Sequence, residues 1–142
     1  MFIRNENFKQ YIHAYPVVSI LIAINLVAYI MTLLPGLGDD IFYLGMSVNG
    51  FILEGEWWRI ITSMFLHGGF MHVLFNMFSL FLFGPELEKI AGKTRFLVIY
   101  FLSGIGGGLA TLLAQYPGYA SVGASGAIFG IFGAFAAILY RY

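Results

Sequence analysis

The sequence predicts an all-α protein, a polytopic membrane helix bundle, and three observations carry that prediction. Of its 142 residues, 60% are hydrophobic and only 10% are charged, whereas globular domains average about 25% charged residues. The charges fall in short groups, which leave residues 10–38, 60–85 and 96–140 uncharged. A helix needs about 20 apolar residues to cross a bilayer. The first two stretches can each hold one crossing and the third can hold two, so we expect four membrane helices.

Turn and interface signals place the segments along the chain. The first apolar run begins near Pro16, a residue suited to a first helical turn. After Pro35 the chain carries both tryptophans beside four acids, and tryptophan favours the headgroup region, so we expect a structured loop partly in the membrane interface. The expected segments are a cytoplasmic or interfacial lead over 1–14, membrane helices over 15–34, 70–85, 96–116 and 125–142, and the loop over 35–69.

Charge and cysteine content restrict the partners. The net charge of zero gives no indication of nucleic acid, and the absence of cysteine excludes disulfides and thiolate metal sites. Lysine and arginine gather near the N-terminus, in residues 86–95 and at the C-terminal end, whereas the opposite side carries only Arg59. Because cytoplasmic loops are rich in these residues, we expect a multi-pass protein of the lipid bilayer with a cytoplasmic N-terminus.

The string Gly123-Ala124-Ser125-Gly126 opens the last expected helix. A serine there keeps its hydroxyl near water and lies beside unpaired backbone N–H donors. An acyl-transfer nucleophile needs both, the donors serving the developing oxyanion. Taken alone, the string is more typical of a helix N-cap serine between packing glycines, and Ala127 stands where the soluble hydrolase elbow has glycine.

Three polar residues, His67, His72 and Asn76, lie around the Gly68-Gly69 break. Polar residues in an apolar span are functional candidates. His72 and Asn76 are four residues apart and share one helix face, at the same outer depth as Ser125, so they can donate to an oxyanion formed there. The alternative is buried hydrogen bonding that only supports the bundle. No carboxylate or cysteine lies near the histidines to complete a tetrahedral set, so we expect no metal.

These motifs, with Trp58-Arg59 in the loop and Glu88 between Gly84 and Gly92, resemble the rhomboid intramembrane serine proteases over residues 15–142. The resemblance implies a serine endopeptidase that cleaves peptide bonds in or next to transmembrane helices of protein substrates, without a cofactor. It implies that Ser125 is the nucleophile. It implies an oxyanion and substrate site of His72, Asn76, Gly123 and the Ser125 backbone, and structural roles for His67, Trp58, Arg59, Glu88 and Phe129.

The chain departs from the family pattern in one respect. Rhomboids have a core of six membrane helices, and the general-base histidine lies on the sixth, but no histidine follows His72 here. We therefore expect four helices of six, without the base, in a chain that is inactive alone. The small residues Gly126, Gly130 and Ala134 suggest a face for a helix that is absent, and Phe129 would stack on the missing histidine. The implied location is the bacterial plasma membrane, with the active-site side extracellular.

Two other classes remain as alternatives. The first is a non-catalytic rhomboid-like membrane protein that binds transmembrane clients, against which the retained Ser125, His72 and Asn76 argue. The second is a small transporter or channel, a class in which paired charges or broken helices at mid-membrane are expected; the expected spans here are uncharged.

Overall fold

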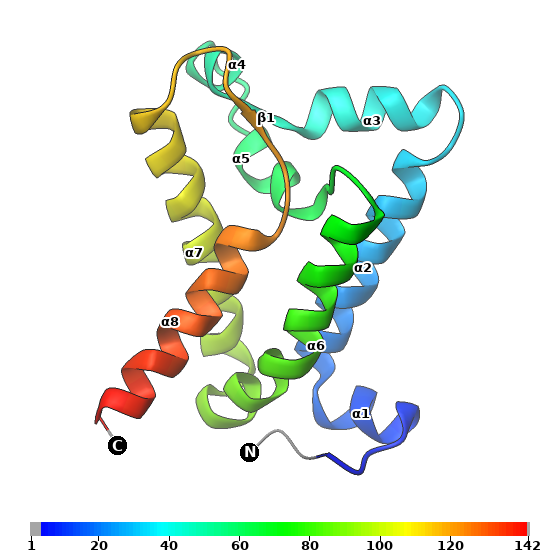
Figure 1. The fold of residues 1–142 in the computed structure, drawn as a ribbon, viewed down its shortest axis with the longest axis vertical. Helices are drawn as coiled ribbons and strands as arrows, with labels where there is room; N and C mark the ends of the chain where they lie inside the picture. The colour runs from blue at the N-terminus through cyan, green and yellow to red at the C-terminus, as the bar shows by residue number, and fades with distance from the viewer. Residues whose placement is uncertain (1–3, 142) are drawn as a thin grey trace.

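The computed structural model describes residues 4–141, most of which are helical, so the predicted all-α fold is confirmed (Figure 1). Residues 1–3 of the expected lead and Tyr142 of the last expected helix lie outside this range. The elements are α1 (Phe8–Ala14), α2 (Pro16–Thr32), α3 (Leu37–Gly45), β1 (Ser47–Val48), α4 (Asn49–Leu53), α5 (Arg59–Thr62), η1 (Ser63–Phe65), α6 (Phe70–Ala91), α7 (Lys93–Ala114), β2 (Ala120–Ser121) and α8 (Ser125–Arg141).

Four of these helices correspond to the expected spans, but they differ in length. Within the described residues, α6 and α7 are each long and apolar enough to cross a membrane alone. Helices α1 and α2 meet that test together, as a pair bent by 111°, and α8 is a shorter apolar helix. The 17 residues of α2 and of α8 extend about 25 Å each. Length and composition thus support two or three spans.

Helix α6 runs to Ala91 and does not end at the expected boundary of residue 85. Proline lacks the N–H that would bond the carbonyl four residues earlier, so Pro85 frees the carbonyl of Phe81. The Tyr11 hydroxyl donates to that carbonyl at 2.9 Å, and its ring stacks on the Phe81 ring at 4.7 Å. A side chain from the lead therefore replaces the lost bond, and the helix continues through the proline.

The other polar anchor at this end of α6 is Glu88, which is 4% exposed. Its two carboxylate oxygens accept the backbone N–H groups of Val18 at 2.9 Å and Val17 at 3.3 Å. These are orphan donors in the first turn of α2, where the positive end of the helix dipole also favours an anion. Glu88 thus caps α2 and fixes it against α6.

The small-residue face of α8 packs on α7, so the prediction that an absent helix would cover it is wrong for its first two turns. A Cβ on Gly126 would lie 3.7 Å from the Cα of Gly104, and a Cβ on Gly130 would collide with the Ser103 side chain. A small-residue stripe signals close helix approach but does not name the partner. The structure supplies α7 as that partner.

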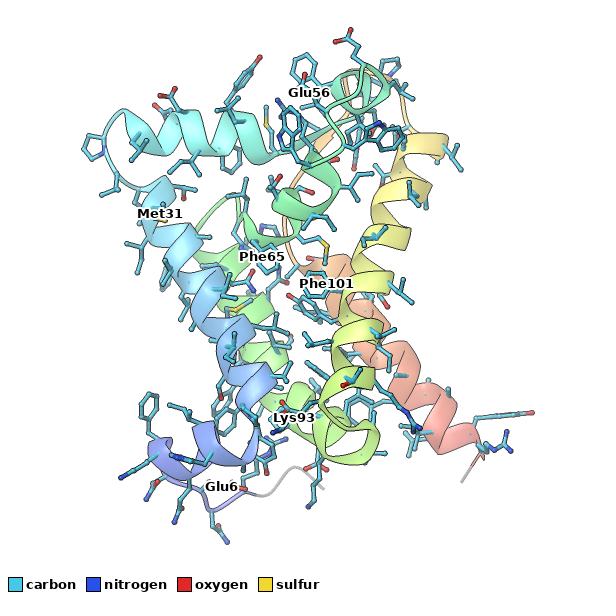
Figure 2. The ribbon with its side chains drawn as sticks, turned by 180° about the vertical axis from the view of Figure 1, so that it is seen from behind. Glu6, Met31, Glu56, Phe65, Lys93 and Phe101 are labelled. Atoms are coloured by element: carbon cyan, nitrogen blue, oxygen red, sulfur yellow. The ribbon has the colours of Figure 1, made fainter. Side chains whose placement is uncertain are left out.

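The first loop forms a layer of short helices at one end of the bundle (Figure 1). Its strand β1 pairs antiparallel with β2, with Ser47 opposite Ser121. Figure 2 shows Glu56 at this end and Glu6 and Lys93 at the other, with Phe65 and Phe101 between them. The two phenylalanine rings lie 6.0 Å apart. Apolar contacts therefore fill the middle of the bundle, and these charged side chains lie at its ends.

Candidate active site

Ser125 is the first residue of α8, and β2 leads the chain down to it, so that α8 begins well below the end of α7 (Figure 1). Its hydroxyl donates to Oδ1 of Asn76 at 3.3 Å. Asn76 lies on α6 and is 8% exposed. Two residues 49 positions apart in the sequence are thus in direct contact.

His72 lies one helical turn before Asn76 on α6. Its Nδ1 accepts the backbone N–H of Gly68 at 3.3 Å. A neutral imidazole that accepts at one nitrogen carries its proton on the other, so Nε2–H is the free donor. A Cβ built on Gly123 would lie 2.7 Å from that Nε2. The donor edge of the ring therefore faces the turn that precedes Ser125.

Two features of position 123 require glycine: its backbone conformation and the close approach of neighbouring side chains. Its φ is +118°, in a region that residues with a Cβ rarely adopt. Its N–H donates to the Ser63 carbonyl at 2.8 Å, and a Cβ would lie 2.6 Å from the His72 ring. Only glycine allows this turn to lie against the imidazole.

The amide nitrogen of Asn76 is buried and has no acceptor among residues 4–141. Buried polar groups in proteins are nearly always hydrogen-bonded, so this Nδ2 is a donor without a resident partner. It lies on the helix face that carries His72, and the first N–H groups of α8 are free at a helix start. Amide and imidazole donors of α6 thus lie against the turn that leads into Ser125, at the start of α8, an arrangement suited to binding an oxyanion.

His67 lies in the turn between η1 and α6 and is 2% exposed. Its ring packs edge-on against His72, with centroids 4.9 Å apart. Burial, and secondly the neighbouring His72, lower the pKa of His67 to about 4. His67 is therefore neutral at pH 7 and supports the His72 ring from behind.

Trp58 and Arg59 organise the first loop at a distance from Ser125. Arg59 is 1% exposed and donates to the carbonyls of Tyr43 and Met46, both at 2.8 Å, and to the Glu56 carboxylate at 2.9 Å. Trp58 donates through Nε1 to an α3 carbonyl at 3.0 Å. These bonds join α3 to α5 and so hold the layer that covers the site.

Phe129 points away from this cluster. It is 70% exposed, and its ring contacts Phe132 at 6.1 Å, edge to face. No group of three or more His, Cys, Asp or Glu side chains that could hold a metal ion occurs in the described part of the chain.

Two contributors to the site carry no sequence signal. Ser63 holds Gly123 through its carbonyl and Gly68 orients His72 through its N–H, and any residue type supplies those backbone groups. Spacing could locate the side chains His72, Asn76 and Ser125, but not the backbone that aligns them.

The fold and this site define the class: an all-helical integral membrane protein with a hydroxyl, an amide and an imidazole clustered beneath a loop layer. Comparison with known proteins gives the family. A model described as the Rhomboid domain matches residues 54–142. The chain is 46% identical to YdcA of Bacillus subtilis over 133 residues. The aligned region covers 92% of this chain and 66% of that protein.

Two further relatives extend the comparison. The rhomboid protease GluP of Bacillus subtilis is 44% identical over 86 residues, covering 61% of this chain and 17% of the relative. The rhomboid protease AarA of Providencia stuartii is 34% identical over 116 residues, covering 72% and 41%. The chain belongs to the rhomboid family. It spans less than two thirds of the length of each of these three relatives.

Proposed function

We propose that this chain carries the nucleophile and the oxyanion site of an intramembrane serine endopeptidase. The contact between the Ser125 hydroxyl and Asn76 at 3.3 Å is the observation that carries the proposal. It places a hydroxyl beside an unpaired amide donor and against the turn that the His72 ring touches. Relatives named as rhomboid proteases support the same reaction class.

In the proposed reaction, Ser125 Oγ attacks the carbonyl carbon of a peptide bond and its proton passes to a general base. The carbonyl oxygen becomes an oxyanion that accepts from Nδ2 of Asn76, Nε2 of His72 and the Ser125 N–H. The C–N bond then breaks, and the amine leaves with the proton. Water hydrolyses the remaining ester and restores the hydroxyl. Each oxyanion donor of this kind can contribute about 10²–10³ to the rate.

The proposed substrates are transmembrane proteins, cut in or next to their helices. A cavity of about 220 Å³ beside Ser125 is lined by further hydroxyl-bearing residues, including Ser63, Thr111 and Ser121. A cavity of this size and polarity can hold several waters, each occupying about 30 Å³. It offers the hydrolytic water a place next to the nucleophile although the site lies within a membrane protein.

The proposed topology has four spans, α2, α6, α7 and α8, with the N-terminus in the cytoplasm of a bacterial cell and Ser125 toward the outside. The distribution of lysine and arginine supports it, because six of the seven lie at one end. The short α2 and α8 fit if the bilayer thins locally or flanking residues reach the interface.

The base for Ser125 is proposed to come from outside these 142 residues, which would then be inactive alone. The chain has three histidines. His72 presents a donor to the site, because its Nδ1 is taken by Gly68, and His67 packs behind that ring. His13 lies on α1, where its Nδ1 contacts the Lys9 carbonyl. None of these rings is hydrogen-bonded to Ser125, whose hydroxyl donates to Asn76.

Cleavage in proteoliposomes tests the proposal. The protein expressed from its complete gene is reconstituted with a fluorescent transmembrane substrate, and cleavage is compared with Ser125→Ala and Ser79→Ala. We expect Ser125→Ala to abolish cleavage and Ser79→Ala, a matched loss of a hydroxyl on α6 outside the cavity, to retain it. Substrate that binds but stays intact in the unsubstituted protein would favour the non-catalytic client-binding class.

A further inference from the structure

We propose that Asn49, in the first loop, is a positioning residue. It fixes the location of Ser125 by holding the backbone of the connection between α7 and α8. The proposal rests on the proposed function only in naming Ser125 as the nucleophile. Asn49 is 1% exposed and opens α4 directly after β1. The Asn49 side chain bonds to Thr111 and Tyr116 and not to Ser125. Its influence on the position of Ser125 therefore passes through the intervening backbone.

The Asn49 amide bridges the end of α7 and the turn beyond it. Its Nδ2 donates to the Thr111 carbonyl at 3.1 Å and to the Tyr116 carbonyl at 3.3 Å. Thr111 lies in the last turn of α7, and Tyr116 follows the end of that helix. One buried amide therefore fixes both the helix end and the first residues of the connection.

The backbone around Asn49 continues this contact along the connection. The N–H of Asn49 donates to the Tyr119 carbonyl at 3.1 Å, and the N–H of Gly50 donates to the Pro117 carbonyl at 2.7 Å. The β1–β2 pairing then places Val48 opposite Ala120. Each of these bonds joins the first loop to residues 116–121, as Figure 1 shows where β1 and the descending strand run side by side.

The connection reaches Ser125 only four residues after β2 ends. Within those residues, the Gly123 N–H donates to the Ser63 carbonyl. Ser63 lies in η1, which belongs to the same first loop as Asn49. A shift of the 116–121 backbone would therefore move Ser125 along its short tether to β2. Because reactive geometry is lost over about 1 Å, a small displacement is enough to separate the hydroxyl from Asn76.

A matched control exists in Asn25. It is also fully buried, at 0% exposure, and its Nδ2 also donates to a carbonyl, that of Leu21 at 2.7 Å. That bond stays within α2, and the Asn25 side chain also interacts with Tyr100 in the middle of α7. The Asn49 bonds differ in that they hold the end of α7 and the connection that follows it. Leucine at either position removes a buried amide of similar size, so the two variants differ chiefly in what the amide held.

The test measures the geometry directly and needs no catalysis. The chain has no cysteine, so the pair Asn76→Cys/Ser125→Cys provides its only two thiols. In detergent, the rate of direct disulfide bridging at a fixed oxidant concentration is measured for the pair alone and with Asn49→Leu, Asn49→Ser or Asn25→Leu, because a disulfide forms only over a narrow range of Cα separation. Thermal unfolding of each protein is measured alongside.

We expect the Asn49 variants to lower the bridging rate by about tenfold or more, since reactive geometry is lost over about 1 Å. Asn25→Leu, at a similar loss of thermal midpoint, is expected to bridge at the parent rate. Equal rates in the Asn49 and Asn25 variants would overturn the proposal, and so would failure of both Asn49 variants to fold, which would make Asn49 a residue of the fold alone. The protein in this assay lacks both proposed catalytic groups, and the assay measures only the distance between two positions. Its result therefore does not depend on whether the protease assignment is correct.

Discussion

Each end of α6 carries a buried polar side chain, and the two differ in whether their hydrogen-bonding groups are paired. Glu88 at one end is 4% exposed and spends both oxygens on the first N–H groups of α2. Asn76 toward the other end is 8% exposed, accepts only the Ser125 hydroxyl, and leaves its Nδ2 without an acceptor among the described residues. The first end is complete in the resting protein, and the second is not.

We propose that this difference separates a supporting end of α6 from an end that takes part in chemistry. A buried group whose bonds are all made stabilises the fold, and removing it leaves its partners unsatisfied. A buried donor without a partner costs stability, and binding of a substrate carbonyl is one explanation for its presence in a folded protein. We therefore expect substitutions at the Glu88 end to change stability, and substitutions at the Asn76 end to change activity.

The largest expected effect is that of Asn76→Ala on the complete protein. It should lower kcat by about 10²–10³, the effect of removing one oxyanion donor. Stability should change by only about 0.5–1.5 kcal/mol, because a single hydrogen bond to Ser125 is lost. Cleavage kinetics and thermal unfolding of the same preparation check both numbers. A large loss of stability with unchanged kcat would erase the distinction between the two ends.

Gly123→Ala should damage both properties. A Cβ there lies 2.6 Å from the His72 ring, so the imidazole must move, and the residue must hold a strained φ that costs about 1–3 kcal/mol. Activity should fall sharply. Gly133→Ala is the control, because a Cβ at that helical position meets nothing within 4 Å; it should stabilise α8 by about 0.5–1 kcal/mol. Similar activities in the two variants would contradict the contact with His72.

Glu88→Gln should act mainly on stability. The amide keeps one acceptor oxygen and leaves one first-turn N–H of α2 without its partner, a cost of about 1–3 kcal/mol. Unfolding in mild detergent measures this loss, and kcat of the folded fraction should stay near the parent value. Glu86→Gln, a less buried neighbour on the same helix, should show a smaller loss. A selective fall in kcat for Glu88→Gln would place this end of α6 in the chemistry.

A pH-dependent effect is expected from His67. Its pKa falls from 6.5 to about 4 on folding, chiefly by burial, so the unfolded chain binds more protons between these pH values. The contribution of neutral His67 to the free energy of unfolding should therefore be fully present above pH 6.5 and decline as the pH falls toward 4. Thermal midpoints across this range, compared with His67→Gln, check the prediction. An identical pH slope in the variant would assign the decline to other groups.

The sequence predicts the membrane helices and the site side chains because each has a local signature. Uncharged stretches mark the helices, and the spacing of His72 and Asn76 places both on one face. The span over 70–85 was expected to end at Pro85, but α6 continues to Ala91. The local sequence could not predict this, because the hydroxyl that replaces the lost bond comes from Tyr11, which is distant in the sequence. The partner of Gly126 was likewise misjudged, since small residues indicate close approach but not which helix approaches.

The first loop shows the same limit more strongly. Its tryptophans predict an interfacial segment, but nothing in the local sequence indicates that Asn49 donates to α7 or that Ser63 anchors Gly123. Such bonds join segments about 60 residues apart and depend on the assembled bundle. Spacing in the sequence identifies the side chains that are proposed to react, whereas the groups that align them become visible only in the fold.

Labelling with a fluorophosphonate tests the central claim, that Ser125 is the nucleophile of a site completed by Asn76 and His72. The complete protein is treated in membranes, digested, and the adduct located by mass spectrometry. We predict an adduct on Ser125 that forms more slowly in Asn76→Ala and is absent when the 142 residues are expressed alone. An adduct on another serine, or none on the complete protein while it cleaves substrate, would contradict the assignment. Labelling of the 142 residues alone would show that they contain their own base.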